Sequence, residues 1–135
     1  MIGIDTNLLV RLLVNDDAAQ ANAVRKLLEP INDTPEAVFI SDLVIAETLW
    51  VLKARYGMDR NAQAGVIDLL LSVKTFAFED RATLERAASA FRHGKAGFAD
   101  CLIVARNRRL GCTVTVTFDK TLARHEGAQL LPTGA

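Results

Sequence analysis

The sequence has no excess of basic residues: 16 Lys and Arg are balanced by 16 Asp and Glu among 135 residues. The net charge therefore attracts no polyanion, and any contact with nucleic acid must be local. Two cysteines, Cys101 and Cys112, are too few for a disulfide framework and lack zinc-ligand spacing, so we expect small core residues in a reducing compartment. Of the two histidines, we expect both His93 and His125 to be solvated surface residues rather than general bases.

Long hydrophobic runs are also lacking. The longest, Leu43 to Leu52, is interrupted by Glu47 and is about half of the ~20 residues that a bilayer crossing requires. The chain reaches the acidic Asp5 almost at once, which leaves no room for the basic and apolar segments of a signal peptide. We therefore expect a cytoplasmic protein that makes no membrane contact.

The composition is that of a compact domain, because 50% of the residues are hydrophobic and 24% are charged. Short β-branched or aromatic runs alternate with longer stretches of helical period, which is typical of a parallel sheet covered by helices. No repeat, linker or low-complexity segment interrupts this pattern. The sequence predicts a single α/β domain over residues 1–135, with three layers (α/β/α).

Local signals predict the individual elements. We expect strands at the β-branched or aromatic runs 2–4, 38–40, 75–78, 113–118 and 129–131. We expect helices directly after Asp5, over 16–28, from Ser41 or Asp42 to Tyr56, and over 60–73, 81–93 and 98–110, with a short one near Leu122. Gly57 fits the left-handed turn that ends the helix before it.

Two acidic residues fall within apolar helical segments. Glu47 lies in the middle of its expected helix among apolar neighbours, so we expect it to have little access to water. A carboxylate in such surroundings is paired, protonated or bound to a metal, and a buried salt bridge with an arginine is the alternative reading. Asp100 opens another apolar helix, where an acid can also simply stabilise the helix dipole.

Two further acids, Asp5 and Asp119, follow expected strands, and the carboxyl ends of parallel strands are where ligands bind. Helix capping and turn formation are ordinary alternatives for both residues. Four carboxylates at one edge repel one another unless a cation lies among them. Oxygen ligands select Mg²⁺ or Mn²⁺ rather than zinc, and such ions activate water for attack on a phosphodiester. The acids therefore predict a metal-dependent nuclease.

Four segments resemble the acidic motifs of PIN domains, and together they span the chain: Ile4-Asp5-Thr6-Asn7, Val44-Ile45-Ala46-Glu47-Thr48, Phe98-Ala99-Asp100-Cys101-Leu102-Ile103 and Thr117-Phe118-Asp119. Their order, their spacing and the total length are most similar to a VapC-type toxin of a bacterial toxin–antitoxin pair. The resemblance implies a metal-coordinating role for four acids, Asp5, Glu47, Asp100 and Asp119. It implies that three polar residues, Thr6, Asn7 and Thr117, orient ligands or water.

The same resemblance implies an architecture and a set of partners. The sheet would be parallel with strand order 3-2-1-4-5, and the protein would be a homodimer. Its substrate would be RNA, cleaved by a metal-activated water, and a small antitoxin protein would inhibit its active site.

Several basic residues follow two of the motifs and could neutralise RNA phosphates: Arg106, Arg108, Arg109, Lys120 and Arg124. We take Arg106 and Lys120 as the RNA-binding candidates. The alternative for each of these residues is a solvated surface position, and Arg108 and Arg109 also suit the negative end of their helix.

Two other functions remain open from the sequence. A PIN-like module could bind RNA or protein without catalysing a reaction. A phosphoacceptor domain is also an α/β fold with Asp at strand ends, and Asp42 would be its acceptor, but this reading leaves Glu47 and Asp100 unexplained. An aspartyl-phosphate phosphatase would need a second Asp where this chain has Asn7.

Overall fold

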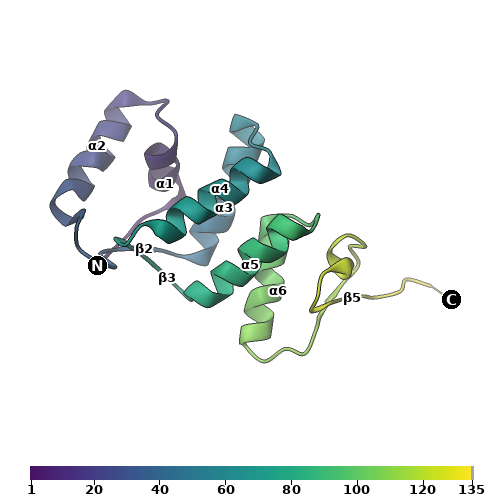
Figure 1. Ribbon diagram of the computed structural model, residues 1–135. Coiled ribbons are helices and arrows are strands. Elements are labelled where there is room, and N and C mark those ends of the chain that lie inside the picture. The colour runs from purple at the N-terminus through teal and green to yellow at the C-terminus, as the bar shows by residue number, and fades with distance from the viewer. Residues whose placement is uncertain (135) are drawn as a thin grey trace. The chain divides into compact units, whose positions relative to one another are not determined.

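A computed structural model describes residues 1–134 of the chain (Figure 1). The chain divides into two compact units, Met1–Glu79 (unit 1) and Asp80–Ala135 (unit 2). No helix within residues 1–134 is long and apolar enough to cross a membrane.

Unit 1 is built around a three-stranded parallel sheet. Its strands are β1 (Ile2–Gly3), β2 (Val38–Ile40) and β3 (Phe76–Phe78), with β2 in the centre. Val38 lies opposite Ile2 on one side and Phe76 on the other. Because the strands are parallel, their carboxyl ends share one edge of the sheet.

The helices of unit 1 are α1 (Thr6–Leu13), α2 (Ala18–Leu28), α3 (Asp42–Tyr56) and α4 (Arg60–Ser72), with the 3-10 helix η1 (Glu29–Ile31) after α2. Helix α1 packs against both α2 and α3 (Figure 1). Apart from the polar Thr48 and Asp42 of α3, the fully buried side chains of unit 1 are aliphatic, as expected for a core: Leu9, Val38, Ile40, Ile45, Leu49, Leu52, Ile67 and Leu70.

Unit 2 contains α5 (Arg81–His93), α6 (Phe98–Arg109), β4 (Thr115–Thr117), the 3-10 helix η2 (Leu122–Arg124) and β5 (Ala128–Leu130). The two helices pack side by side, and Phe91 meets Phe98 edge to face with ring centroids 5.8 Å apart. Strands β4 and β5 form a parallel pair.

The local signals of the sequence are reflected in these elements. Ser41, rather than Asp42, caps α3 by accepting a hydrogen bond from the Val44 N–H, and Gly57 has the expected left-handed φ of 65°. The strand expected over 113–118 is shorter and covers Thr115–Thr117.

The strand order agrees with the expectation within each sheet, since β1, β2 and β3 are consecutive neighbours and β4 pairs with β5. The expected neighbours β1 and β4 belong to different units, so this pairing stays a prediction. The single domain over residues 1–135 also stays a prediction.

Candidate functional site

Asp5 directly follows β1 and is the N-cap of α1. Its Oδ1 accepts a hydrogen bond of 2.9 Å from the Leu8 N–H, while its Oδ2 accepts none within residues 1–134. The side chain is exposed. Asp5 is therefore a helix cap, as the alternative reading expected, and the cap uses only one of its two carboxylate oxygens.

Glu47 lies in the middle of α3, as expected, but it is exposed. The expectation that it lacks access to water is therefore wrong. The apolar neighbours Ile45 and Leu49 point into the core, and Glu47 lies on a different face of the helix. Within residues 1–134 it makes no ion pair or hydrogen bond, which removes the buried salt bridge with an arginine as an explanation.

Asp100 occupies the first turn of α6 and is half-buried. The N-cap of this helix is Gly97, which has no side chain to satisfy the first N–H groups. The negative charge of Asp100 thus suits the helix dipole. This contribution to stability does not prevent Asp100 from binding a cation, since its carboxylate is in no ion pair within the described residues.

Asp119 follows β4 closely and is exposed. Its Oδ1 accepts hydrogen bonds from the N–H groups of Thr121, at 2.8 Å, and Leu122, at 3.2 Å. The Thr117 Oγ1 accepts one from the Asp119 N–H at 3.0 Å, so Thr117 orients the segment that carries Asp119. Here too a turn holds one carboxylate oxygen in place.

The remaining candidates lie on the same elements. Thr6 and Asn7 open α1, with Thr6 half-buried and Asn7 exposed. Arg106, in the last turn of α6, is half-buried, and Lys120 is exposed directly after Asp119.

Two of the four acids thus belong to each unit: Asp5 and Glu47 to unit 1, Asp100 and Asp119 to unit 2. Within residues 1–134, neither unit by itself gathers three or more His, Cys, Asp or Glu side chains into a possible metal site. The convergence of the four acids on one site therefore remains a prediction.

The sheet edge of unit 1 carries a further acid that the sequence analysis did not single out. Glu79 directly follows β3, and its Oε2 accepts a hydrogen bond of 2.6 Å from the Asp42 N–H. The sequence could have pointed to Glu79, because this residue directly follows the strand expected over 75–78. Asp42 itself is only 1% exposed in the first turn of α3, which is unsuitable for a phosphoacceptor that must meet its donor.

Three expectations for side chains outside the acidic motifs need correction. Cys101 is buried as expected, but Cys112 is exposed and is no core residue. His93 is exposed, whereas His125 is half-buried and accepts a hydrogen bond of 3.4 Å from the Ala96 N–H. Arg109 is not simply solvated, because its guanidinium lies 3.8 Å from Asp80.

These features define an α/β protein with parallel strands and with acidic residues at strand ends and on helices. The chain belongs to the PIN domain family, which it matches over residues 2–128. The VapC ribonuclease of Aquifex aeolicus (strain VF5) is 21% identical over 117 residues, which are 87% of this chain and 86% of that protein. Among solved structures, VapC20 of Mycobacterium tuberculosis, titled a sarcin-ricin loop cleaving toxin, is 25% identical with a TM-score of 0.41, covering 98% of this chain and 100% of that chain. The family match confirms the resemblance drawn from the four acidic motifs.

Proposed function

We propose that this chain is a metal-dependent endoribonuclease and the toxin of a toxin–antitoxin pair. The observation that carries the proposal is the match to the PIN domain family over residues 2–128, a range that includes all four acids. The similarity to a protein named VapC ribonuclease supports the choice of RNA as substrate and the toxin role.

The proposed metal ligands are Asp5, Glu47, Asp100 and Asp119. Their donor set suits a hard divalent cation, because it consists of carboxylate oxygens alone. Within residues 1–134 none of the four is neutralised by Lys or Arg, so each negative charge is available to a cation. When bound, Mg²⁺ or Mn²⁺ would supply the activation of water and the stabilisation of charge developing on the phosphodiester.

The contribution of the chain itself is to orient these oxygens before any ligand arrives. The caps at Asp5 and Asp119 each fix one oxygen by backbone hydrogen bonds and leave the other to a ligand. Thr117 supports Asp119 through the Asp119 N–H, and we propose that Thr6 and Asn7 orient ligands or water. Arg106 and Lys120 would neutralise phosphates of the bound RNA.

We propose two protein partners, a second copy of the chain and a small antitoxin. An acidic site is best blocked by arginine, whose planar fork can engage carboxylates bidentately in place of a metal. The inhibitory segment of the antitoxin should therefore carry a critical arginine. An antitoxin whose arginines have all been changed to Ala should fail to restore growth to cells that express this chain.

The experiment that tests the proposed activity is cleavage of RNA by the purified protein with Mg²⁺ or Mn²⁺ and with excess EDTA. Cleavage should require the metal and leave 5′-phosphate and 3′-hydroxyl ends. Asp100→Asn should abolish it, and Asp33→Asn, which changes an exposed acid outside the motifs, should not. Activity that persists in EDTA, or 2′,3′-cyclic phosphate ends, would show that the metal is not needed. RNA binding without cleavage by the wild type would show a silent binding module instead.

A further inference from the structure

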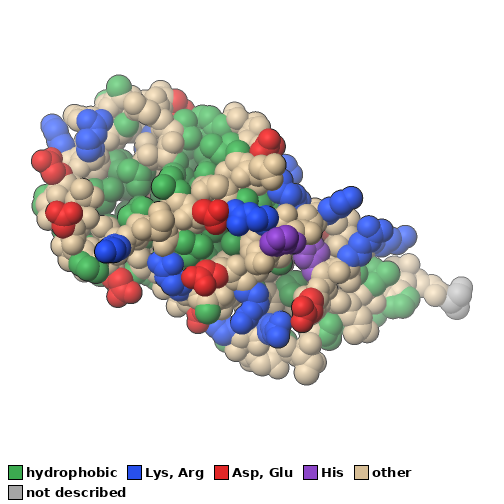
Figure 2. Space-filling model, viewed as in Figure 1, with side chains coloured by type: hydrophobic (Ala, Val, Ile, Leu, Met, Phe, Trp, Pro, Cys, Tyr) green, Lys and Arg blue, Asp and Glu red, His purple; other side chains and the backbone are tan. Residues whose placement is uncertain are grey.

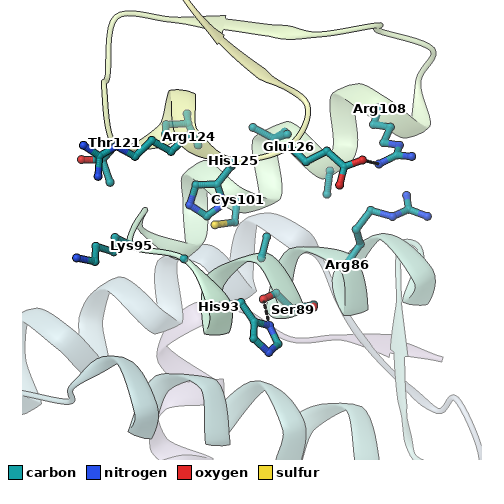
Figure 3. Close-up of a pocket in the computed structure, with 15 residues that line it drawn as sticks. Arg86, Ser89, His93, Lys95, Cys101, Arg108, Thr121, Arg124, His125 and Glu126 are labelled. Atoms are coloured by element: carbon teal, nitrogen blue, oxygen red, sulfur yellow. Dashed lines mark hydrogen bonds and ion pairs between the residues drawn. The ribbon is translucent and has the colours of Figure 1, made fainter.

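Unit 2 contains a cavity of about 670 Å³ formed by α5, the loop that follows it, α6 and η2 (Figure 3). Its apolar lining comes from the facing sides of these elements and includes Cys101, Val104, Ala105 and Leu122. The cavity contains none of the four acids and none of the polar residues assigned to the active site. Its volume is in the range of pockets that bind small organic ligands.

The charged residues around this cavity are mainly basic. Arg86, Lys95, Arg108 and Arg124 line it, and among the described lining residues the acidic member is Glu126. Glu126 lies 3.7 Å from Arg108 and offsets its charge, whereas Arg86 and Arg124 make no ion pair within residues 1–134. Figure 3 shows Arg86 and Arg108 at one end and Lys95 and Arg124 at the other. In the space-filling view the purple histidines of the chain lie beside blue Lys and Arg side chains (Figure 2). A chain with no net charge thus has a local positive potential at this cavity.

His125 lies between the two basic ends, beside Cys101 (Figure 3). The Ala96 N–H donates a hydrogen bond of 3.4 Å to its Nε2. A Cβ on Gly94 would lie 2.2 Å from the His125 Cε1, so the ring rests directly against the backbone. The cavity thus offers a planar ring in a fixed position next to an apolar floor, and nucleobases stack on such rings.

We propose that this cavity binds one nucleotide of a single-stranded RNA segment. The base would lie on the apolar floor beside His125, and the flanking phosphates would contact Arg86 at one end and Arg124 at the other. A nucleotide combines an aromatic plane with anionic phosphates, which matches both the floor and the rim. An acidic peptide matches the rim alone. The choice of RNA as the ligand rests on the proposed ribonuclease function. The cavity and the charges around it are structural observations that do not depend on that function.

Fluorescence anisotropy tests this proposal with a labelled single-stranded RNA of about ten nucleotides, in EDTA so that the RNA is not cleaved. The double variant Arg86→Ala/Arg124→Ala should weaken binding roughly tenfold and reduce the slope of log affinity against log salt by about 1.4, since each phosphate contact on a single strand contributes about 0.7. The matched control is Arg25→Ala/Arg55→Ala, which removes two exposed arginines of unit 1. If the cavity is the binding site, the RNA affinity of this control variant and its slope of log affinity against log salt should stay near the wild-type values.

A second variant tests the contribution of the apolar floor to RNA binding separately from the contribution of the basic residues. Ser89 is exposed and lines the cavity, so Ser89→Trp would fill the space without removing a charge or a buried side chain. It should weaken RNA binding severalfold and leave the salt slope unchanged, whereas Ser89→Ala should bind as the wild type does. Circular dichroism melts establish that each variant is folded.

Each outcome supports or overturns the proposal. Equal binding by the cavity variants and their controls would overturn it, even if the wild type cleaves RNA with Mg²⁺. Arginine-dependent binding of a poly-glutamate peptide, with no such dependence for RNA, would identify an acidic protein partner and overturn it as well. Loss of RNA binding in the cavity variants would support it even if the wild type cleaves no RNA, in which case the proposed function alone fails.

Discussion

The imidazole of His125 lies against the backbone of Gly94, in the space that a side chain at position 94 would need. The contact joins the C-terminal end of α5 to the segment after η2, and both belong to unit 2. Because Gly94 has a φ of −118°, which any residue adopts, glycine is required there for space and not for backbone conformation.

Gly94→Ala should therefore destabilise the protein by about 1–3 kcal/mol, because the added methyl group must displace the His125 ring and its hydrogen bond with Ala96. Urea unfolding measures this change. Gly65→Ala is the matched control, since Gly65 lies within α4 with open space around it. That substitution should stabilise the protein by about 0.5–1 kcal/mol, as expected for alanine in a helix interior. Equal effects of the two substitutions would show that the His125 contact does not constrain the fold.

A pair of substitutions separates the observed role of Asp5 as a helix cap from its proposed role as a metal ligand. Asp5→Asn keeps a side-chain oxygen for the Leu8 N–H and should leave the free energy of unfolding nearly unchanged. Asp5→Ala removes the cap and should cost about 1 kcal/mol. Both should reduce the rate of RNA cleavage on the order of 100-fold, as the loss of one electrostatic contributor does. If Asp5→Asn cleaves at the wild-type rate, Asp5 is a cap alone.

For Glu47 the exposed position predicts a small effect on stability. Glu47→Gln should change the free energy of unfolding by less than about 0.5 kcal/mol, because no ion pair within residues 1–134 is lost. RNA cleavage should nevertheless collapse if Glu47 binds the metal. A loss of roughly 3–5 kcal/mol would instead reveal a salt bridge whose positive partner is left buried.

Metal binding should raise the melting temperature of the wild type, because an ion that binds only the folded state stabilises it by mass action. At a Mg²⁺ concentration 100 times the dissociation constant, the gain is about 2.7 kcal/mol. Asp100→Asn should gain much less, and Asp33→Asn should gain as much as the wild type. Identical melts in Mg²⁺ and EDTA for all three proteins would contradict the proposed metal site.

Asp16 should make the stability of unit 1 depend on pH. The Tyr56 hydroxyl donates a hydrogen bond to Asp16, and the Arg11 guanidinium lies beside it, so the pKa of Asp16 is lowered below its ordinary value of 3.8. A carboxyl whose pKa is lower in the folded state stabilises the protein above its unfolded pKa, and this contribution is lost as the pH falls through the folded pKa.

Tyr56→Phe removes the main cause of this shift. The wild type should therefore be more stable than Tyr56→Phe at pH 7, and the difference should shrink at pH values below about 4. Urea unfolding at a series of pH values measures both curves. The lowered pKa of Asp80, caused by its hydrogen bonds with Thr83, is common to both proteins and cancels in the comparison. Parallel curves down to pH 2 would show that Tyr56 does not tune Asp16.

The acidic motifs and the elements that carry them could be predicted from the sequence because their signals are local. A helix cap such as Ser41 acts on an N–H three residues away, and the left-handed turn at Gly57 depends on the absence of its own Cβ. The placement of Asp5 and Asp119 after strands follows from the same short-range patterns.

The exposure of Glu47 and the cavity of unit 2, by contrast, depend on tertiary packing. The apolar neighbours of Glu47 suggested burial, yet which face of α3 meets the core depends on the elements that pack against it, and Glu47 lies on an exposed face. The cavity of unit 2 brings Arg86 of α5 and Arg124 of η2 to the same space, although nothing in the spacing of these two residues indicates that they share a site. The sequence by itself determined the strands, helices, caps and motif positions, because each depends on residues a few places apart. Only the packing of α5, α6 and η2 decided where the positive charges gather, because that packing joins residues that are distant along the chain.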